Sequence, residues 1–273
     1  MAVAIVNDVL THYEHMPARP STGRTAPKVV CVHGLGYDSL ASFYLTLAAP
    51  LAEAGVDVLT YDLRGHGRSQ RPATGYRLGD FVDDLRSLLD MMVGTEPVHL
   101  VGNSFGGTIA FSLAVRYPER VRSIVSIESE PATEVWSAKM GRTFRNTVDA
   151  MSDEANLAWI TETFGSHYAR LTRAAAAVIR STTIVEEVAD GPLLDEQALS
   201  SIRCPVLAIL GGEGFQCDDL GAVEAMLPDC RTEVIDGQNH SVLVERHQLV
   251  RKLLLGWLAE HDPVGLLADG ARP

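Results

Sequence analysis

The sequence predicts an α/β fold built on a mostly parallel sheet. Short apolar runs rich in β-branched residues recur along the chain, for example over 28–32 and 98–101. Such runs are typical of strands that are buried on both faces. Amphipathic segments of helical length separate them, over 40–54, 77–92 and 104–117. With 273 residues, 46% of them hydrophobic, the chain is long enough to form a full core.

The first two strands are expected to form a hairpin at one edge. Apolar and β-branched residues over 3–6 and 10–13 flank the pair Asn7-Asp8, which favours a tight turn. The later strands are expected over 28–32, 56–61, 98–101, 121–127, 206–210 and 232–235, with further helices over 218–226 and 241–259. Strands separated by helices imply right-handed crossovers and helices on both faces of the sheet.

This alternation stops over 131–200, where helical periodicity dominates and no apolar strand is expected. We therefore predict a core made of residues 1–130 and 201–262, interrupted by a helical cap over 131–200. Residues 263–273 are expected to form a flexible tail.

Composition and charge favour a small-molecule substrate. The formal net charge is −12, from 35 acidic and 23 basic side chains, which disfavours binding to nucleic acid or to anionic membranes. No apolar run reaches the length of a membrane span, and the first residues lack the features of a secretory leader. We expect a cytoplasmic protein in which the four cysteines are reduced thiols, because they show no metal-binding spacing. The oligomeric state is not indicated.

The strongest chemical motif is Gly102-Asn103-Ser104-Phe105-Gly106, which lies between an expected strand and an expected helix. This is the context of a nucleophile elbow, in which a strained turn presents a serine at the start of a helix. Small residues on both sides allow neighbouring chain segments to pass closely. We predict that Ser104 is the nucleophile.

A serine hydroxyl needs a base, and the base needs a group that fixes its tautomer. Among the nine histidines, His240 follows the last expected strand in the loop Asp236-Gly237-Gln238-Asn239 and comes just before the final helix. We predict that His240 is the base.

These motifs resemble those of the α/β-hydrolase superfamily. Four segments carry the resemblance in order: His33-Gly34-Leu35-Gly36, Asp62 to Ser69, Gly102 to Gly107 and Gly237 to His240. The resemblance implies an eight-stranded sheet with a helical cap and an oxyanion hole formed by the backbone N–H groups of Leu35 and Phe105. The segment 62–69 is expected to be a structural turn beside the site.

The acid of the triad departs from the commonest pattern of that superfamily. Where many members carry an aspartate after the strand ending at Leu210, this chain has Gly211-Gly212-Glu213-Gly214-Phe215-Gln216-Cys217-Asp218. Some members, including zearalenone-type lactonases and some haloalkane dehalogenases, instead use a glutamate directly after the preceding core strand. Glu128 occupies that position and is our first candidate. Asp218, Glu130, Glu213 and Asp219 remain as alternatives.

The resemblance implies an acyl hydrolase that cleaves an ester, lactone or thioester through an acyl-enzyme, without a metal or an organic cofactor. Large apolar residues in the cap segment favour an apolar acyl substrate; they are Trp136, Met140, Phe144, Trp159, Phe164 and Tyr168. The same triad could serve carbon–carbon bond hydrolysis, elimination or cyclisation. A third hypothesis is a ligand-binding receptor with vestigial activity.

Overall fold

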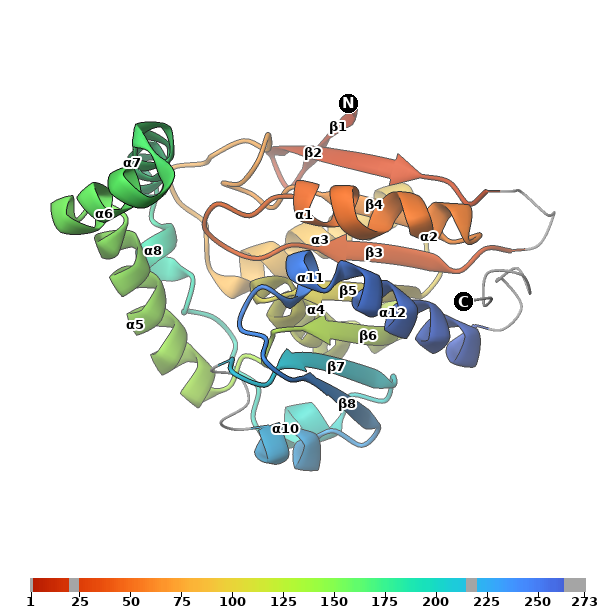
Figure 1. The fold of residues 1–273 in the computed structure, drawn as a ribbon. Helices are drawn as coiled ribbons and strands as arrows, with labels where there is room; N and C mark the ends of the chain where they lie inside the picture. The colour runs from red at the N-terminus through yellow and green to blue at the C-terminus, as the bar shows by residue number, and fades with distance from the viewer. Residues whose placement is uncertain (1, 20–24, 215–219, 263–273) are drawn as a thin grey trace.

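A computed structural model describes residues 2–19, 25–214 and 220–262. Within these residues, eight strands form one sheet in the order β1-β2-β4-β3-β5-β6-β7-β8 (Figure 1). Their bounds are β1 (Ala2–Val6), β2 (Val9–Met16), β3 (Lys28–Val32), β4 (Asp57–Tyr61), β5 (Val98–Asn103), β6 (Val121–Ile127), β7 (Val206–Gly211) and β8 (Cys230–Ile235). β2 runs antiparallel to β1 and β4, and the other neighbours are parallel. The predicted fold class is confirmed.

The edge hairpin has a tight turn at its tip. Asn7 and Asp8 adopt φ values of 45° and 62°, as the two central residues of a type I′ turn require. Asparagine and aspartate tolerate this left-handed conformation better than most residues do. The Asn7-Asp8 pair seen in the sequence therefore explains the tight turn between β1 and β2.

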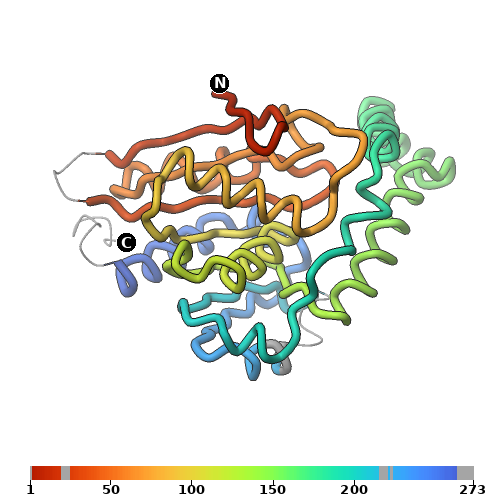
Figure 2. Tube along the Cα trace, turned by 180° about the vertical axis from the view of Figure 1, so that it is seen from behind, coloured from red at the N-terminus to blue at the C-terminus, as the bar shows by residue number. Residues whose placement is uncertain are grey.

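Helices cover both faces of the sheet (Figures 1 and 2). On one face lie α1 (Ala41–Phe43), α2 (Ala49–Glu53), α11 (Val242–Glu245) and α12 (His247–His261), and on the other lie α3 (Leu78–Met92) and α4 (Phe105–Arg116). Alternate strand residues enter opposite cores, so Val30 and Val32 of β3 pack with α3 and α4, whereas Val29 and Cys31 pack towards α2 and α12. Burial on both sides accounts for the continuous apolar runs.

Two expected helices are interrupted. The segment predicted as one helix over 40–54 contains a π-helical stretch, η1 (Tyr44–Ala48), between α1 and α2. Pro50 follows this stretch and lacks the N–H that would bond to the Thr46 carbonyl, which favours an irregular turn there. The helix predicted over 241–259 divides at Arg246, which leaves the helical conformation with φ −119° and ψ 25°. This break lets Val242 and Val250 both reach the core.

Between β6 and β7 the chain forms α5 (Glu134–Ala150), α6 (Glu154–Phe164), α7 (Ser166–Arg180), α8 (Ile184–Glu187) and α9 (Glu196–Ser200). Helices α6 and α7 pack against each other and project beyond the carboxyl edge of the sheet, at the upper left of Figure 1. The Glu187 carboxylate accepts the N–H groups of Gly75 and Tyr76 and so attaches α8 to the core. Because α9 packs on α10 (Leu220–Met226), the cap boundary at 200 stays a prediction.

No helix in the described part of the chain combines the length and apolar character needed to span a bilayer. Cys31, Cys204 and Cys230 are free thiols, whereas Cys217 and the expected tail over 263–273 lie outside the described residues.

The buried histidine His99 makes the stability depend on pH. Burial lowers its pKa to about 4, below the value of about 6.5 for an unfolded chain. The folded state therefore binds fewer protons below about pH 6.5, and the stabilisation present above that pH is lost as pH falls towards 4. At about pH 5 the expected loss from His99 alone is about 2 kcal/mol.

Urea unfolding of the wild type and His99→Gln at about pH 7.5 and pH 5 measures this loss. We expect the wild type to lose more unfolding free energy on acidification than His99→Gln. The exposed His167 on α7 gives the control His167→Gln, which should behave as the wild type. Equal losses in all three proteins would contradict the assignment.

Candidate active site

Ser104 occupies the turn between β5 and α4 and has a strained backbone. Its φ of 51° and ψ of −121° lie in a region that costs a non-glycine residue about 1–3 kcal/mol. Its N–H donates to the Ile127 carbonyl at 2.8 Å, which extends the pairing of β5 with β6 by one residue. The sheet thus holds the serine in this conformation.

Glycines beside Ser104 are required because the chain passes too closely for a side chain. A Cβ atom at Gly102 would lie 2.3 Å from the Gly107 nitrogen, and one at Gly106 would lie 1.9 Å from the Val32 carbonyl oxygen. These contacts involve backbone atoms, which cannot move aside as a flexible side chain would. The two outer glycines of the motif therefore let α4 start directly above β3 and β5.

The structure brings Ser104, His240 and Glu128 into one hydrogen-bonded line. Nε2 of His240 lies 3.1 Å from the Ser104 hydroxyl oxygen, and Nδ1 lies 3.3 Å from Oε2 of Glu128. A carboxylate only accepts, so Nδ1–H is the donor and Nε2 is left to accept from the serine hydroxyl. This tautomer is the one that a general base requires.

Glu128 is buried at the end of β6, with only 1% of the residue exposed. Its φ is also positive, at 51°, and its N–H donates to the Ile209 carbonyl at 2.9 Å. Its second carboxylate oxygen, Oε1, accepts the N–H of Gly211. A buried carboxylate is stable only when such partners compensate it. One carboxylate oxygen of Glu128 is held by Gly211, and the other faces His240, whose side chain is 37% exposed.

The loop carrying Leu35 lies against Ser104. A Cβ atom at Gly34 would be 3.2 Å from the Ser104 Cβ. Phe105 begins α4, where the helix dipole favours negative charge. Among the described residues, neither the Leu35 N–H nor the Phe105 N–H donates to an intramolecular acceptor. Both are therefore available to a bound oxyanion.

Side chains hold the amides on both sides of Leu35. The Gly34 N–H donates to Oδ2 of Asp38 at 2.8 Å, and the Gly36 N–H donates to Nε2 of His66 at 3.1 Å. Nδ1–H of His66 donates to the Arg64 carbonyl at 2.9 Å. Burial lowers the pKa of His66 to about 4, so its Nε2 remains an acceptor at neutral pH. This arrangement fixes the direction of the Leu35 N–H.

The rest of the segment 62–69 is a buried turn. Asp62 accepts the N–H groups of Leu40 and Arg68 at 2.8 and 2.9 Å and pairs with Nδ1 of His12 at 2.7 Å. A Cβ atom at Gly67 would lie 2.2 Å from the Asp62 carboxyl carbon. The segment therefore supports the Leu35 loop through His66.

The family model described as "alpha/beta hydrolase fold" matches residues 27–206, well over half of the chain. This chain is an α/β-hydrolase. The match covers Ser104, Glu128 and the Leu35 loop, and His240 lies beyond it.

Relatives of this α/β-hydrolase carry several activities in their names. A Bacillus subtilis protein with the provisional name 2-succinyl-6-hydroxy-2,4-cyclohexadiene-1-carboxylate synthase is 29% identical over 84% of this chain and 89% of its own length. A 2-hydroxymuconate semialdehyde hydrolase of a Pseudomonas species is 38% identical, but over 41% of each chain. Apart from the Bacillus protein, the chain spans about a quarter to a half of the length of the first relatives that it matches.

Among solved structures, the enol-lactonase of Burkholderia xenovorans LB400 superposes with a TM-score of 0.70 over 94% of this chain and 100% of its own, at 23% identity. This likeness supports the shared fold.

The other acid candidates make different contacts or lie outside the described residues. Glu130 pairs with Lys139 of α5, and the N–H of the exposed Glu213 donates to the Gln238 carbonyl at 2.9 Å. Asp218 and Asp219 are outside the described residues. No group of three or more side chains suited to a metal ion occurs in the described part of the chain.

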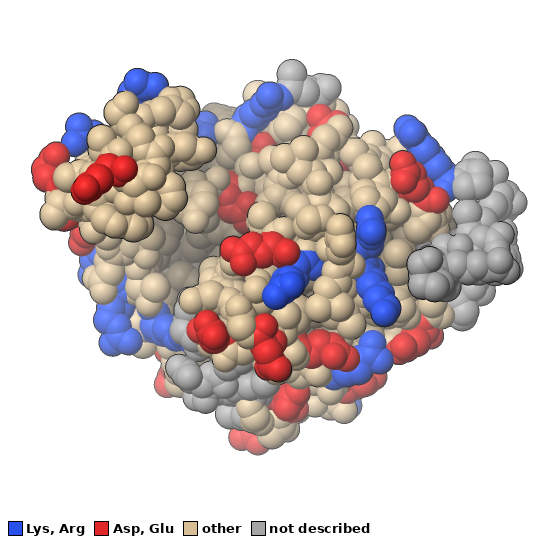
Figure 3. Space-filling model, viewed as in Figure 1, with Lys and Arg blue, Asp and Glu red and all other residues tan. Residues whose placement is uncertain are grey.

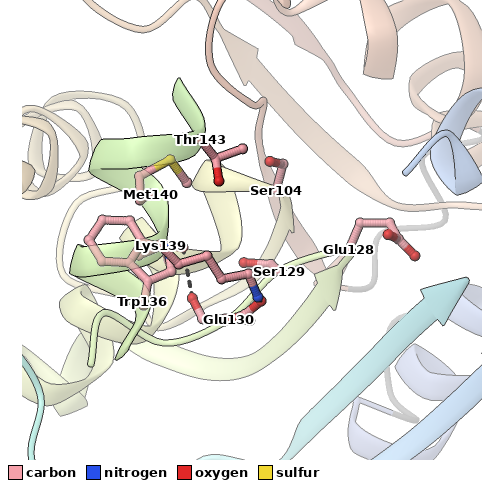
Figure 4. Close-up of a pocket in the computed structure, with 9 residues that line it drawn as sticks. Ser104, Glu128, Ser129, Glu130, Trp136, Lys139, Met140 and Thr143 are labelled. Carbon is pink, nitrogen blue, oxygen red and sulfur yellow. Dashed lines mark hydrogen bonds and ion pairs between the residues drawn. The ribbon is translucent and has the colours of Figure 1, made fainter. Parts of the chain in front are cut away.

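A small pocket of about 40 Å³ lies next to Ser104, between the end of β6 and helix α5 (Figure 4). Its lining residues are Ser104, Thr108, Glu128, Ser129, Glu130, Trp136, Lys139, Met140 and Thr143. Figure 3 shows a wider hollow between the projecting helices α6 and α7 and the rest of the molecule, with mainly uncharged walls. Of the aromatic residues named from the sequence, Trp136 lines the pocket, whereas Trp159, Phe164 and Tyr168 are more than half exposed.

Sequence reasoning missed Asp38, Ser129 and Gly211. Asp38 and Ser129 each follow a recognised motif within a few residues, but their partners come from contacts that no local pattern encodes. Gly211 carried a signal in the pair Gly211-Gly212, which marks a close approach without saying to what.

Gly211 provides a sharp test of the geometry. A Cβ atom there would lie 2.4 Å from the Gln238 carbonyl oxygen, whereas at the neighbouring Gly212 the nearest atoms are 3.5 Å away. Gly211→Ala should therefore displace both the loop before His240 and the N–H donor to Glu128. We expect covalent labelling of Ser104 by a fluorophosphonate to slow at least about tenfold.

Gly212→Ala is the matched control and should label at nearly the wild-type rate. Thermal unfolding of both variants shows whether the Gly211→Ala protein remains folded at the assay temperature. Equal labelling rates in the two variants would show that the close approach at Gly211 is unimportant for the site.

Proposed function

We propose that this protein is a serine hydrolase that cleaves a carboxylic ester, lactone or thioester of a small, largely apolar substrate through an acyl-enzyme. The observation that carries the proposal is the continuous line from the Ser104 hydroxyl through His240 to the buried Glu128 carboxylate. The outward-facing histidine and the mainly uncharged hollow fit a small-molecule substrate. The location that we propose for the protein is the cytoplasm.

In the first half of the reaction, Nε2 of His240 accepts the Ser104 proton as the serine oxygen attacks the carbonyl carbon. The backbone N–H groups of Leu35 and Phe105 stabilise the oxyanion of the tetrahedral intermediate. Such donors are each worth about 3 kcal/mol of transition-state stabilisation. The Glu128 carboxylate, held by the Gly211 N–H, stabilises the imidazolium that forms. His240 then protonates the leaving group.

In the second half, His240 removes a proton from water, which attacks the acyl-enzyme carbonyl on the same face. The second tetrahedral intermediate collapses, Ser104 regains its proton from His240, and the carboxylic acid leaves. The positions of Asp38 and His66 matter in both halves because both half-reactions use the Leu35 N–H. The cycle balances with water as the sole co-reactant.

A second candidate function is elimination, cyclisation or carbon–carbon bond cleavage by the same residues. The observation favouring it is that the relative matched over most of both chains is named a synthase. In elimination and cyclisation, His240 would act as a base on the substrate itself, and no water oxygen would enter the product.

Turnover of short-chain p-nitrophenyl esters and a lactone panel tests the first proposal. Ser104→Ala should lose activity by roughly a million-fold, to the background rate, because it removes the nucleophile. The product formed in ¹⁸O-water should carry one labelled carboxylate oxygen. Full turnover by Ser104→Ala would exclude the serine mechanism, and product without label would favour elimination or cyclisation.

A further inference from the structure

The pocket beside Ser104 has a polar corner that the proposed reaction does not use. Ser129 directly follows Glu128, and its hydroxyl oxygen is buried without a hydrogen-bond partner among the described residues. It packs against the first turn of α4, since a Cβ atom at Gly107 would lie 2.3 Å from it. Ser104 and Ser129 line the same pocket (Figure 4).

A buried hydroxyl without a partner costs about 1–3 kcal/mol, so such groups need an explanation. Another hydroxyl of the same pocket is already engaged, because Thr108 donates to the Glu130 carbonyl at 2.7 Å. Ser129 therefore offers a hydroxyl that can gain a hydrogen bond when a molecule enters. Ser129 lines the same pocket as Ser104, where a substrate would bind.

The opposite wall of the pocket is apolar. Trp136 and Met140 of α5 line this side (Figure 4), and Trp136 stacks on the buried Phe105 ring with 6.2 Å between centroids. These side chains can pack on carbon atoms while the Ser129 hydroxyl contacts a polar atom. A pocket of about 40 Å³ has roughly the volume of one or two water molecules. It therefore has room for only the few atoms of a short acyl group that lie nearest the carbonyl.

The charges of the lining residues favour an uncharged polar atom. Two carboxylates, Glu128 and Glu130, and one ammonium group, Lys139, line the pocket. Lys139 is paired with Glu130, and Glu128 is committed to His240 and Gly211. An acyl group bearing its own carboxylate would add a third negative charge at short range, which is unfavourable in a partly buried site.

We propose that Ser129 is a substrate-binding residue that hydrogen-bonds an uncharged hydroxyl, ether or keto oxygen on a short acyl chain, while Trp136 and Met140 contact its carbon atoms. This inference rests on the proposed ester or lactone hydrolysis and names the substrate class within it: short oxygen-substituted acyl groups.

Isosteric ester pairs test the proposal. The p-nitrophenyl esters of methoxyacetate and butanoate differ by an ether oxygen in place of a methylene group, as do those of 3-methoxypropanoate and pentanoate. The ether oxygen also changes the intrinsic reactivity of the ester. The measured quantity is therefore the kcat/KM of the ether ester divided by the kcat/KM of its alkyl partner, and this ratio is compared between the wild type and Ser129→Ala. We expect Ser129→Ala to lower this ratio by roughly three- to tenfold for at least one pair, through loss of one hydrogen bond.

Ser126→Ala is the matched control. Ser126 lies on β6, shortly before Ser129, and its hydroxyl is also buried without a partner in the described structure, but it does not line the pocket. Its ratios should equal those of the wild type. Wild-type preference for p-nitrophenyl hemisuccinate over p-nitrophenyl pentanoate would overturn the uncharged class.

Failure of this inference differs from failure of the proposed function. If the wild type hydrolyses all four esters and Ser129→Ala leaves every ratio unchanged, the role of Ser129 is wrong while ester hydrolysis stands. If the wild type hydrolyses none of them and Ser104 does not react with a fluorophosphonate, the proposed hydrolysis is wrong and the subsite falls with it.

Discussion

The site depends on one buried charge, the carboxylate of Glu128. The residue is only 1% exposed, so its charge must be compensated by fixed partners or the fold would not tolerate it. Those partners are the Gly211 N–H on one oxygen and the His240 ring on the other. The same compensation orients His240 towards Ser104. The stability of the buried carboxylate and the alignment of the His240 ring with Ser104 are therefore one structural requirement.

Parallel pairing of three central strands meets that requirement. The ends of β5, β6 and β7 supply Ser104, Glu128 and Gly211, and the ladder continues past β5 and β6 through the N–H groups of Ser104 and Glu128. These bonds hold two non-glycine residues at positive φ, a strain that only surrounding structure can sustain. The short reach of the Glu128 side chain then fixes where the loop before His240 must pass.

The order of strands and helices along the chain could be predicted from the sequence, because burial on both faces leaves continuous apolar runs. The turn at Ser104 could also be predicted, because it needs glycines at 102 and 106. The position of Glu128 directly after β6 also made this residue the first candidate for the acid. The sequence could not place Asp38, His66 or Ser129, whose importance comes from contacts between distant segments. The π-helical stretch before Pro50 and the break at Arg246 were missed because periodicity continues through both.

The most direct measurement is the rate at which a fluorophosphonate modifies Ser104, followed by mass spectrometry, in the wild type, Glu128→Gln and Asp218→Asn. If Glu128 is the acid, Glu128→Gln slows modification by roughly a thousand- to ten-thousand-fold, and Asp218→Asn reacts at nearly the wild-type rate. Modification of Glu128→Gln at the wild-type rate, with Asp218→Asn inactive, would contradict the account.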